Sequence, residues 1–282
     1  NLHSFPTRCS SHLSDLLRCN WLHLQNIDLM EYFSHHRDVG TWNWNIVASL
    51  SSSYVSITQH ESAKALINQH SKNQDTQWKI IAYEYCISQE QIDIKISNSL
   101  DKDIQNIMAL QSSNARSSLS EKIKNLLIAS KFYVLKSQHD ILENNYPEAY
   151  EDSRFAIKIL VSIARKIGNT YPNRMFTELK MESSQLLSLA YSTILECLIN
   201  SGVLFEFEYY IREYSIFNES LTIGLPLLTL ENLTQISYFK LLLMDYEGAW
   251  CSLSKLANTA SALRPYKLWY KLKSSMLIKH MV

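Results

Sequence analysis

Four residues near the start of the chain carry side chains that commonly bind zinc: Cys9, His12, Cys19 and His23. Thiolate and imidazole are frequent zinc ligands, and the pairs are separated by two and three residues. On one continuous helix, however, the four would extend over about 21 Å, because each residue advances the helix by 1.5 Å. If the helix breaks near Asn20, the gap of six residues is still short for a zinc-finger loop. We therefore expect no metal and no cofactor.

The run Cys9-Ser10-Ser11 contains the thiol that most resembles a nucleophile. A reactive cysteine needs a neighbouring base and usually a backbone turn that stabilises an anion. Here Arg8 precedes the thiol, no glycine provides a turn, and no strand is expected before it. We therefore expect no catalysis at Cys9.

Other patterns associated with catalysis are weak or missing. The pair His35-His36 is expected at a solvated helix end, and Glu206 and Glu208 are two residues apart, so they point to different sides of a helix. The chain has no dinucleotide fingerprint, no P-loop and no His-Glu-x-x-His motif. We expect no catalytic residue in this chain.

Aromatic residues are concentrated in one later segment. Six occur within thirteen positions: Phe205, Phe207, Tyr209, Tyr210, Tyr214 and Phe217. Packing between helical repeats accounts for part of such a set, since all six cannot face one core. The rest, together with Arg212, could line a groove for an extended peptide, because tyrosine and arginine are typical anchors at interfaces. The predicted groove residues are Tyr209, Tyr210, Arg212, Tyr214, Tyr246 and Trp250.

Composition and periodicity predict helices to position these residues. Glycine and proline number five each in 282 residues, too few for the turns of a β-rich fold of this size. Apolar residues recur at helical spacing in most of the chain. The helices expected after residue 120 span 121–143, 147–167, 181–200, 203–220, 227–244 and 246–263, and a last one starts at Tyr266. The earlier pattern predicts one amphipathic helix from Trp78 to Leu100, and the serines at 51–53 weaken the helix expected before them.

These helices are expected to form antiparallel pairs. Tyr146-Pro147-Glu148-Ala149 and Tyr246-Glu247-Gly248-Ala249 both open the second helix of a pair with tyrosine and place alanine three positions later. The small residue lets the first helix approach closely, while the tyrosine fills the gap at the turn, as in tetratricopeptide (TPR) repeats. The units are longer than the usual 34 residues. We predict an all-α, TPR-like α-solenoid, with an irregular helical region at 1–110, a linker at 111–120 and helical hairpins at 121–282.

Charge and cysteine usage exclude several classes of protein. The 27 basic and 27 acidic residues are interspersed, whereas a nucleic-acid-binding protein usually concentrates positive charge on one face. No apolar run is long enough to span a bilayer, and Asn1–Arg8 has no charged start followed by an apolar core, so we expect no signal peptide there. The five scattered cysteines are expected to be buried reduced thiols. We expect an intracellular protein with no direct nucleic-acid or membrane partner.

The run from Ile123 to about Asn258 resembles the helical region of separase, especially of the budding-yeast type. Three stretches carry the resemblance: KIKNLLIASKFYVLKSQHDILENNYPEAYEDSRFAIKILVSIARKI (Lys122–Ile167), SLAY (Ser188–Tyr191) and SGVLFEFEYYIREYSIF (Ser201–Phe217). The similarity covers about half the chain and lies in spacing and residue character. Residues 1–110 match no family.

The resemblance implies a scaffold segment of a large cysteine endopeptidase that acts in mitosis, in the cytoplasm and nucleus. Separase cleaves the kleisin subunit of cohesin to separate sister chromatids, and securin binds along its helical region and its caspase-like domain as an extended inhibitory chain. The family's catalytic His-Gly and Gly-Cys-Ser-Ser motifs are not in this sequence, and Cys9-Ser10-Ser11 lacks the glycine. The implied partners are a securin-like inhibitor and the protease domain of the same chain. The alternative is a TPR-like adaptor unrelated to separase.

Overall fold

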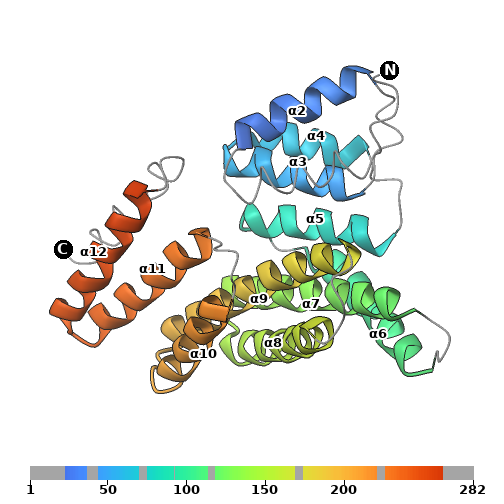
Figure 1. Ribbon diagram of the computed structural model, residues 1–282. Coiled ribbons are helices and arrows are strands. Elements are labelled where there is room, and N and C mark those ends of the chain that lie inside the picture. The colour runs from blue at the N-terminus through green and yellow to red at the C-terminus, as the bar shows by residue number, and fades with distance from the viewer. Residues whose placement is uncertain are drawn as a thin grey trace. The chain divides into compact units, whose positions relative to one another are not determined.

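A computed structural model describes residues 23–36, 44–69, 75–91, 93–113, 118–168, 174–220 and 226–262 of the chain. Within these residues there are eleven helices and no strand, which confirms the predicted all-α class (Figure 1). The predicted solenoid arrangement stays a prediction. None of the helices in the described ranges is both long and apolar enough to cross a membrane. Several sequence predictions fall on residues whose side chains the structure does not describe. They concern the possible zinc ligands Cys9, His12, Cys19 and His23, the pair His35-His36, and the helix predicted from Tyr266.

Residue contacts divide the chain into two compact units, and the boundary in the sequence lies between Ile96 and Ser97. The first unit contains α2 (His23–His36), α3 (Trp44–Ser56), α4 (His60–Gln69) and α5 (Thr76–Ser88). The division falls within α6 (Ile94–Ser113). The second unit contains α7 (Leu119–Leu142), α8 (Tyr146–Gly168), α9 (Arg174–Ser201), α10 (Phe207–Ser220), α11 (Pro226–Leu242) and α12 (Tyr246–Ala262). Helix α6 therefore runs into the predicted 111–120 linker, and α7 begins inside it.

In the first unit, α3 continues through the serine run that the sequence pattern marked as a weak point. Ser51 and Ser53 are buried, and the amide of the buried Asn26 on α2 donates to Ser53 Oγ at 2.8 Å. The Ser53 hydroxyl thus serves as a hydrogen-bond partner for a buried side chain of another helix. The apolar core of this unit lies around these polar residues and includes Met30 and Val47.

The single helix predicted from Trp78 to Leu100 is wrong, because the chain turns after Ser88 and begins a new helix at Ile94. The turn contains Glu90 with φ of 52°. Asp93 then caps α6, since its Oδ1 accepts from the amides of Lys95 and Ile96 at 3.0 Å each. The apolar spacing continues across the break, so periodicity alone could not locate it.

Five helices in the described ranges end in the same turn. The residue at positive φ is Thr58, Glu90, Asn144, Gly202 or Met244, with values of 52–71°. In each case the next amide donates to the carbonyl five residues earlier, at 2.7–3.1 Å. This is the Schellman pattern, which satisfies carbonyls left free at a helix end. The predicted turns at Asn144–Asn145, Ser201–Gly202 and Asp245 are confirmed.

Replacement of Thr58 by glycine should stabilise the first unit. A β-branched residue is strained at φ of 64°, and Thr58 is exposed. Steric relief of ~1–2 kcal/mol outweighs the greater chain entropy of glycine, ~0.4–1 kcal/mol, so the free energy of unfolding should rise by about 0.5–1 kcal/mol. Urea denaturation followed by circular dichroism measures the change. Asn144→Gly should gain less, since asparagine tolerates this region; an equal or larger gain there would contradict the explanation.

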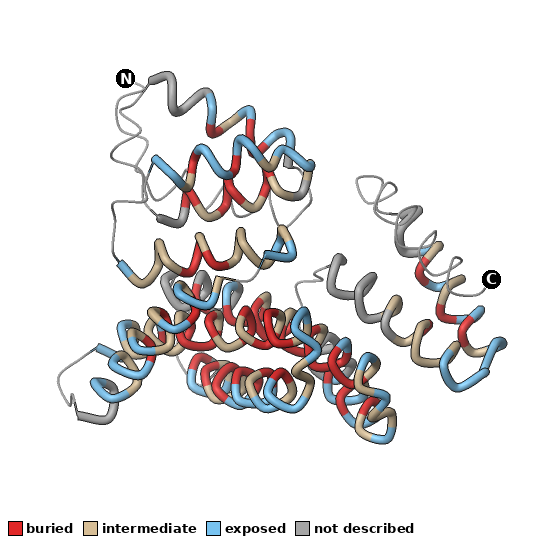
Figure 2. The backbone as a smooth tube through the Cα atoms, turned by 180° about the vertical axis from the view of Figure 1, so that it is seen from behind, coloured by how far each residue is buried: buried red, intermediate tan, exposed pale blue. Residues whose placement is uncertain are grey.

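The core of the second unit is built around α9. This helix contacts α7, α8, α10 and α11. Apolar side chains of α9 such as Ile194 and Leu195 are fully buried together with Leu160 of α8 and Phe207 of α10. Buried residues accordingly concentrate along α7, α8 and α9 (Figure 2). Helix α9 begins seven residues before the predicted start at Met181, and α10 begins at Phe207 after a turn that was predicted as helix.

The alanine part of the predicted repeat pattern is confirmed, and the tyrosine part is wrong at one of its two positions. Ala149 and Ala249 are 0% and 1% exposed, so the helices of both pairs approach closely at these residues. Tyr246, however, is 64% exposed and fills no gap at the turn. Tyr146 is half-buried, and its hydroxyl donates to Asn144 Oδ1 at 2.8 Å. The small residue is the element that the two turns share.

Candidate partner-binding groove

The second unit contains a groove of about 660 Å³ between α8 and α10. One wall is a stripe of α8, the other is a face of α10, and α9 contributes between them. The lining residues are Ile157, Lys158, Val161, Ser162, Arg165 and Lys166 of α8, Tyr191 of α9, and Tyr209, Tyr210 and Glu213 of α10. The α8 residues recur at helical spacing, which keeps all of them on one face.

The packing of α8 and α10 on α9 explains why a groove forms. Cys197, near the end of α9, donates its thiol to the Tyr146 carbonyl at the start of α8, at 3.3 Å, so α8 and α9 are antiparallel. Helix α10 is also antiparallel to α9, because it follows the turn at Gly202 and Tyr214 stacks on Tyr191. Helices α8 and α10 are therefore parallel neighbours on one face of α9, with the space between them open.

A tyrosine contact closes one end of the groove. The Tyr150 hydroxyl of α8 donates a short hydrogen bond to Glu206, just before α10, and lies 3.2 Å from the Tyr210 hydroxyl. The Tyr150 and Tyr210 rings meet edge to face, with centroids 6.3 Å apart. These contacts fix the start of α10 against α8. Tyr210 belongs to both the contact and the lining, and the α8 lining residues begin further along that helix, at Ile157.

The two walls differ in charge. Burial, followed by Glu213, raises the pKa of Tyr191 to about 12, and burial also raises the pKa of Tyr210. Tyr191 and Tyr210 are thus neutral hydrogen-bonding groups at neutral pH. The α8 wall carries Lys158, Arg165 and Lys166, whereas Glu213 is the acidic residue of the lining. The groove combines an apolar centre, a tyrosine wall and a basic wall.

Comparison with known protein families, with curated proteins and with solved structures finds no match for this chain. The groove and the exposed surfaces of the described residues therefore supply the evidence for function.

The structure brings only two of the six predicted groove residues into this groove. Tyr209 is 60% exposed and forms part of its wall, next to Tyr210, which is largely buried. Tyr214 is fully buried in the core, where its hydroxyl lies 2.5 Å from Ser188 Oγ. Arg212 is exposed outside the lining and pairs with Glu208 at 3.4 Å. Helical spacing did not separate the core tyrosines from the surface ones, because both lie on α10.

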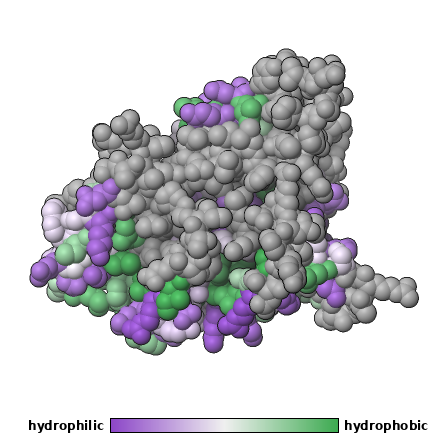
Figure 3. All heavy atoms as spheres, viewed as in Figure 1, coloured by the Kyte–Doolittle hydropathy of each residue, from purple (hydrophilic) through white to green (hydrophobic). Residues whose placement is uncertain are grey.

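Tyr246 and Trp250 lie on a different element, the α11–α12 hairpin. Both are exposed, at 64% and 69%, and the turn before them exposes Leu242, Leu243 and Met244. Figure 3 shows hydrophobic side chains at the surface at the lower left, where α11 and α12 meet. Of the six predicted residues, two line the groove and two lie at the end of this hairpin, while Arg212 and Tyr214 belong to neither surface.

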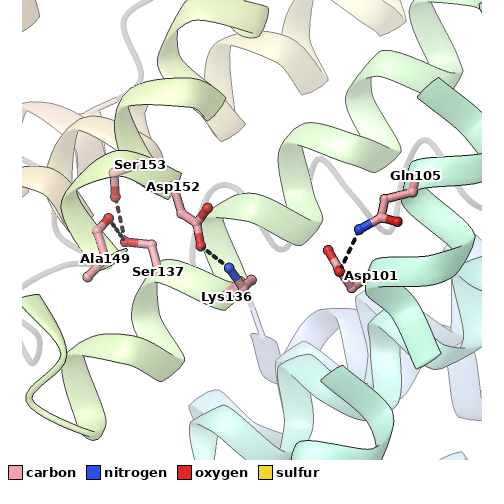
Figure 4. A network of polar contacts seen from close by, with 7 residues as sticks. All are labelled: Asp101, Gln105, Lys136, Ser137, Ala149, Asp152 and Ser153. Carbon is pink, nitrogen blue, oxygen red and sulfur yellow. Dashed lines mark hydrogen bonds and ion pairs between the residues drawn. The ribbon is translucent and has the colours of Figure 1, made fainter. Parts of the chain in front are cut away.

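A polar cluster links α7 and α8 (Figure 4). Lys136 Nζ lies 2.6 Å from Asp152 Oδ2, and the Ser137 hydroxyl donates to the Ala149 carbonyl at 2.6 Å. Asp140 is buried beside them. Burial raises its pKa to about 6; Lys136 opposes this shift, while Asp152, Glu143 and Glu148 add to it. No described atom makes a hydrogen bond to Asp140 Oδ2. The cluster links the two helices of the hairpin and leaves one oxygen of the Asp140 carboxyl without a hydrogen-bond partner among the described atoms.

The described thiols are in three different settings. Cys197 is buried, and its burial raises its pKa to about 11, so it is protonated at neutral pH. Cys86 is half-buried and its pKa is also raised by burial. Cys251 is exposed, so the prediction that the thiols are buried is wrong there. Among the described residues no group of histidine, cysteine and acidic side chains is placed to hold a metal ion.

The sequence interpretation missed the basic wall. Lys158 and Arg165 are seven residues apart, two helical turns, so they share one exposed face of α8. That spacing is visible in the sequence. Their position opposite the tyrosines of α10 depends on the packing of both helices on α9, which the sequence pattern does not give.

Proposed function

We propose that this chain is a helical scaffold that holds an extended segment of a partner polypeptide in the α8–α10 groove. The observation that supports this most is the lining, where the exposed Tyr209 and the basic side chains of α8 flank an apolar centre. Tyrosine and arginine are enriched among residues that dominate binding energy at protein interfaces. The groove volume of about 660 Å³ is also within the range of ligand pockets, roughly 300–1,000 Å³.

A more specific form of the proposal is that the scaffold belongs to a separase-like cysteine endopeptidase. In that form the helices support the protease domain and bind a securin-like inhibitor, which controls cleavage of the cohesin kleisin. The resemblance at Lys122–Ile167 and Ser201–Phe217 supports it, and these stretches contribute both walls of the groove. The alternative is a TPR-like adaptor that gathers other proteins through the same groove.

A calorimetric titration of the full chain with a securin-like inhibitor chain tests both the groove as a binding site and the separase form of the proposal. Ser162 lines the groove, so Ser162→Trp should fill it and weaken binding by roughly 10-fold or more, a loss of ~1.4 kcal/mol. Glu151→Trp, at an exposed position of α8 outside the lining, is the matched control and should change binding less than about 2-fold.

The outcomes separate the two forms. Binding that Ser162→Trp leaves intact would contradict the groove as the site. Failure of the inhibitor chain to bind would remove the separase form and leave the adaptor. Sequencing the transcript downstream of Val282 is an independent check, because a His-Gly motif followed by Gly-Cys-Ser-Ser would identify a separase.

A further inference from the structure

We infer that the groove selects an acidic segment of its partner, with two carboxylate side chains three residues apart and an apolar residue between them. This inference rests on the proposed function and specifies the partner for the same site. Lys158, Arg165 and Lys166 lie along one wall, and the acidic Glu213 lies on the other. A partner with carboxylates toward α8 therefore meets positive charge on one side and keeps away from Glu213 on the other.

Several basic side chains of the second unit are already paired with acids. Lys136 pairs with Asp152, Arg154 with Glu151, and Arg212 with Glu208. By contrast, Lys158 and Arg165 are exposed and have no acidic partner among the described residues. Their charges are available to a bound chain. Because they border an apolar groove, a bound carboxylate there would be partly shielded from water and attracted more strongly than at an open surface.

The spacing of the two basic residues defines the spacing of the acids. Seven residues of helix advance about 10.5 Å, at 1.5 Å each. A polyproline II chain advances about 3.1 Å per residue and returns to the same side every three residues, so residues i and i+3 are ~9.3 Å apart on one face. Carboxylates at i and i+3 therefore match Lys158 and Arg165. The side chain between them can point toward Ile157, Val161 and Tyr191.

A nucleic acid fits these observations less well than a peptide does. Phosphate backbones carry a charge at every nucleotide and need a continuous basic surface. The chain as a whole has 27 basic and 27 acidic residues, and Glu213 lies in the lining itself. Two separated cations beside an apolar centre match two separated carboxylates. Single-stranded RNA is the competing ligand that the experiment must exclude.

The experiment has two stages and uses the full chain. Random short peptides displayed on phage are selected against the wild type, with excess soluble Ser162→Trp chain present to remove peptides that bind elsewhere. The labelled peptide Ser-Glu-Leu-Pro-Glu-Ser, its Lys-for-Glu counterpart and a labelled single-stranded RNA are then titrated by fluorescence anisotropy. The variants are Lys158→Glu with Arg165→Glu, the control Lys102→Glu with Lys124→Glu at exposed positions outside the lining, and Glu213→Gln.

We expect selected peptides to be enriched in acids at i and i+3. The acidic peptide should bind about 10-fold more weakly to the Lys158→Glu/Arg165→Glu chain and almost unchanged to the control, and the Glu213→Gln chain should bind it more tightly. The peptide with Lys in place of Glu should instead bind more tightly to the Lys158→Glu/Arg165→Glu chain than to the wild type. Selection of groove-binding peptides without acids would overturn this inference and keep the proposed function. Selection of no peptide that Ser162→Trp excludes would overturn both. RNA binding lost in the charge-reversed chain, without peptide binding, would also overturn it.

Discussion

Tyr214→Ala should lower the free energy of unfolding of the second unit by about 3–5 kcal/mol, the usual cost of removing a buried aromatic ring. Tyr214 is fully buried, its ring stacks on Tyr191 with centroids 5.4 Å apart, and its hydroxyl lies 2.5 Å from Ser188 Oγ. The change leaves a cavity between α9 and α10. Because α10 forms one wall of the groove, peptide binding should be lost together with stability. Urea denaturation measures the first effect and anisotropy the second.

Two further variants identify the source of the loss. Tyr209→Ala removes an exposed ring from the same helix and should change stability by less than about 0.5 kcal/mol. Tyr214→Phe keeps the ring and removes the hydroxyl, leaving Ser188 without this partner, so it should cost about 1 kcal/mol. If Tyr214→Ala and Tyr209→Ala destabilised equally, α10 would not be anchored as the structure shows.

Asp140→Asn should make the protein more stable at neutral pH, by about 1–3 kcal/mol, since each pKa unit is worth 1.36 kcal/mol. The pKa of Asp140 is raised from 3.8 to about 6 in the folded chain, chiefly by burial. The folded state thus holds the proton more tightly than the unfolded state does. The protonated Asp140 carboxyl therefore contributes to the free energy of unfolding. This contribution is fully present below about pH 4 and is lost as the pH rises through 6. Asparagine is neutral throughout and avoids this loss.

The measurement is the difference in unfolding free energy between the two proteins from pH 4 to pH 7.5, by urea denaturation. Other titrating groups contribute to both proteins and largely cancel in the difference. The curves should coincide near pH 4 and separate as the pH rises, with the variant above. A constant difference, or a wild type that becomes the more stable protein at pH 7, would show that Asp140 is not destabilised by ionisation.

Local sequence predicted the helical hairpins well and tertiary packing poorly. Asn144, Gly202 and Asp245 mark real turns because turn geometry depends on neighbouring residues, and Ala149 and Ala249 mark close helix contacts. The serines of α3 were judged by their own preference for loops, whereas their helix is supported by Asn26 of another helix. A hydrogen-bond partner distant in sequence therefore supports the helix at these serines.

The same limit applies to the groove. Tyr209 and Tyr210 could be proposed as lining from the sequence, since tyrosine-rich helix faces often form interfaces. Tyr214 could not be excluded, because its burial depends on Tyr191 and Ser188 of α9. Lys158 and Arg165 were visible as a spacing of two helical turns, but their relation to α10 required the two helices to be packed as parallel neighbours.

The central position of α9 also determines the order in which the second unit can assemble during synthesis. The α7–α8 hairpin closes through local contacts, so it can form as soon as residues 119–168 leave the ribosome. Its apolar residues Leu160 and Ile163 belong to one buried cluster with residues of α9, so this cluster stays incomplete until α9 follows, on the order of seconds later at typical elongation rates. In that interval the nascent chain presents an apolar surface that a chaperone can bind. A slow codon cluster before Arg174 would prolong this stage, and a fast one would shorten it.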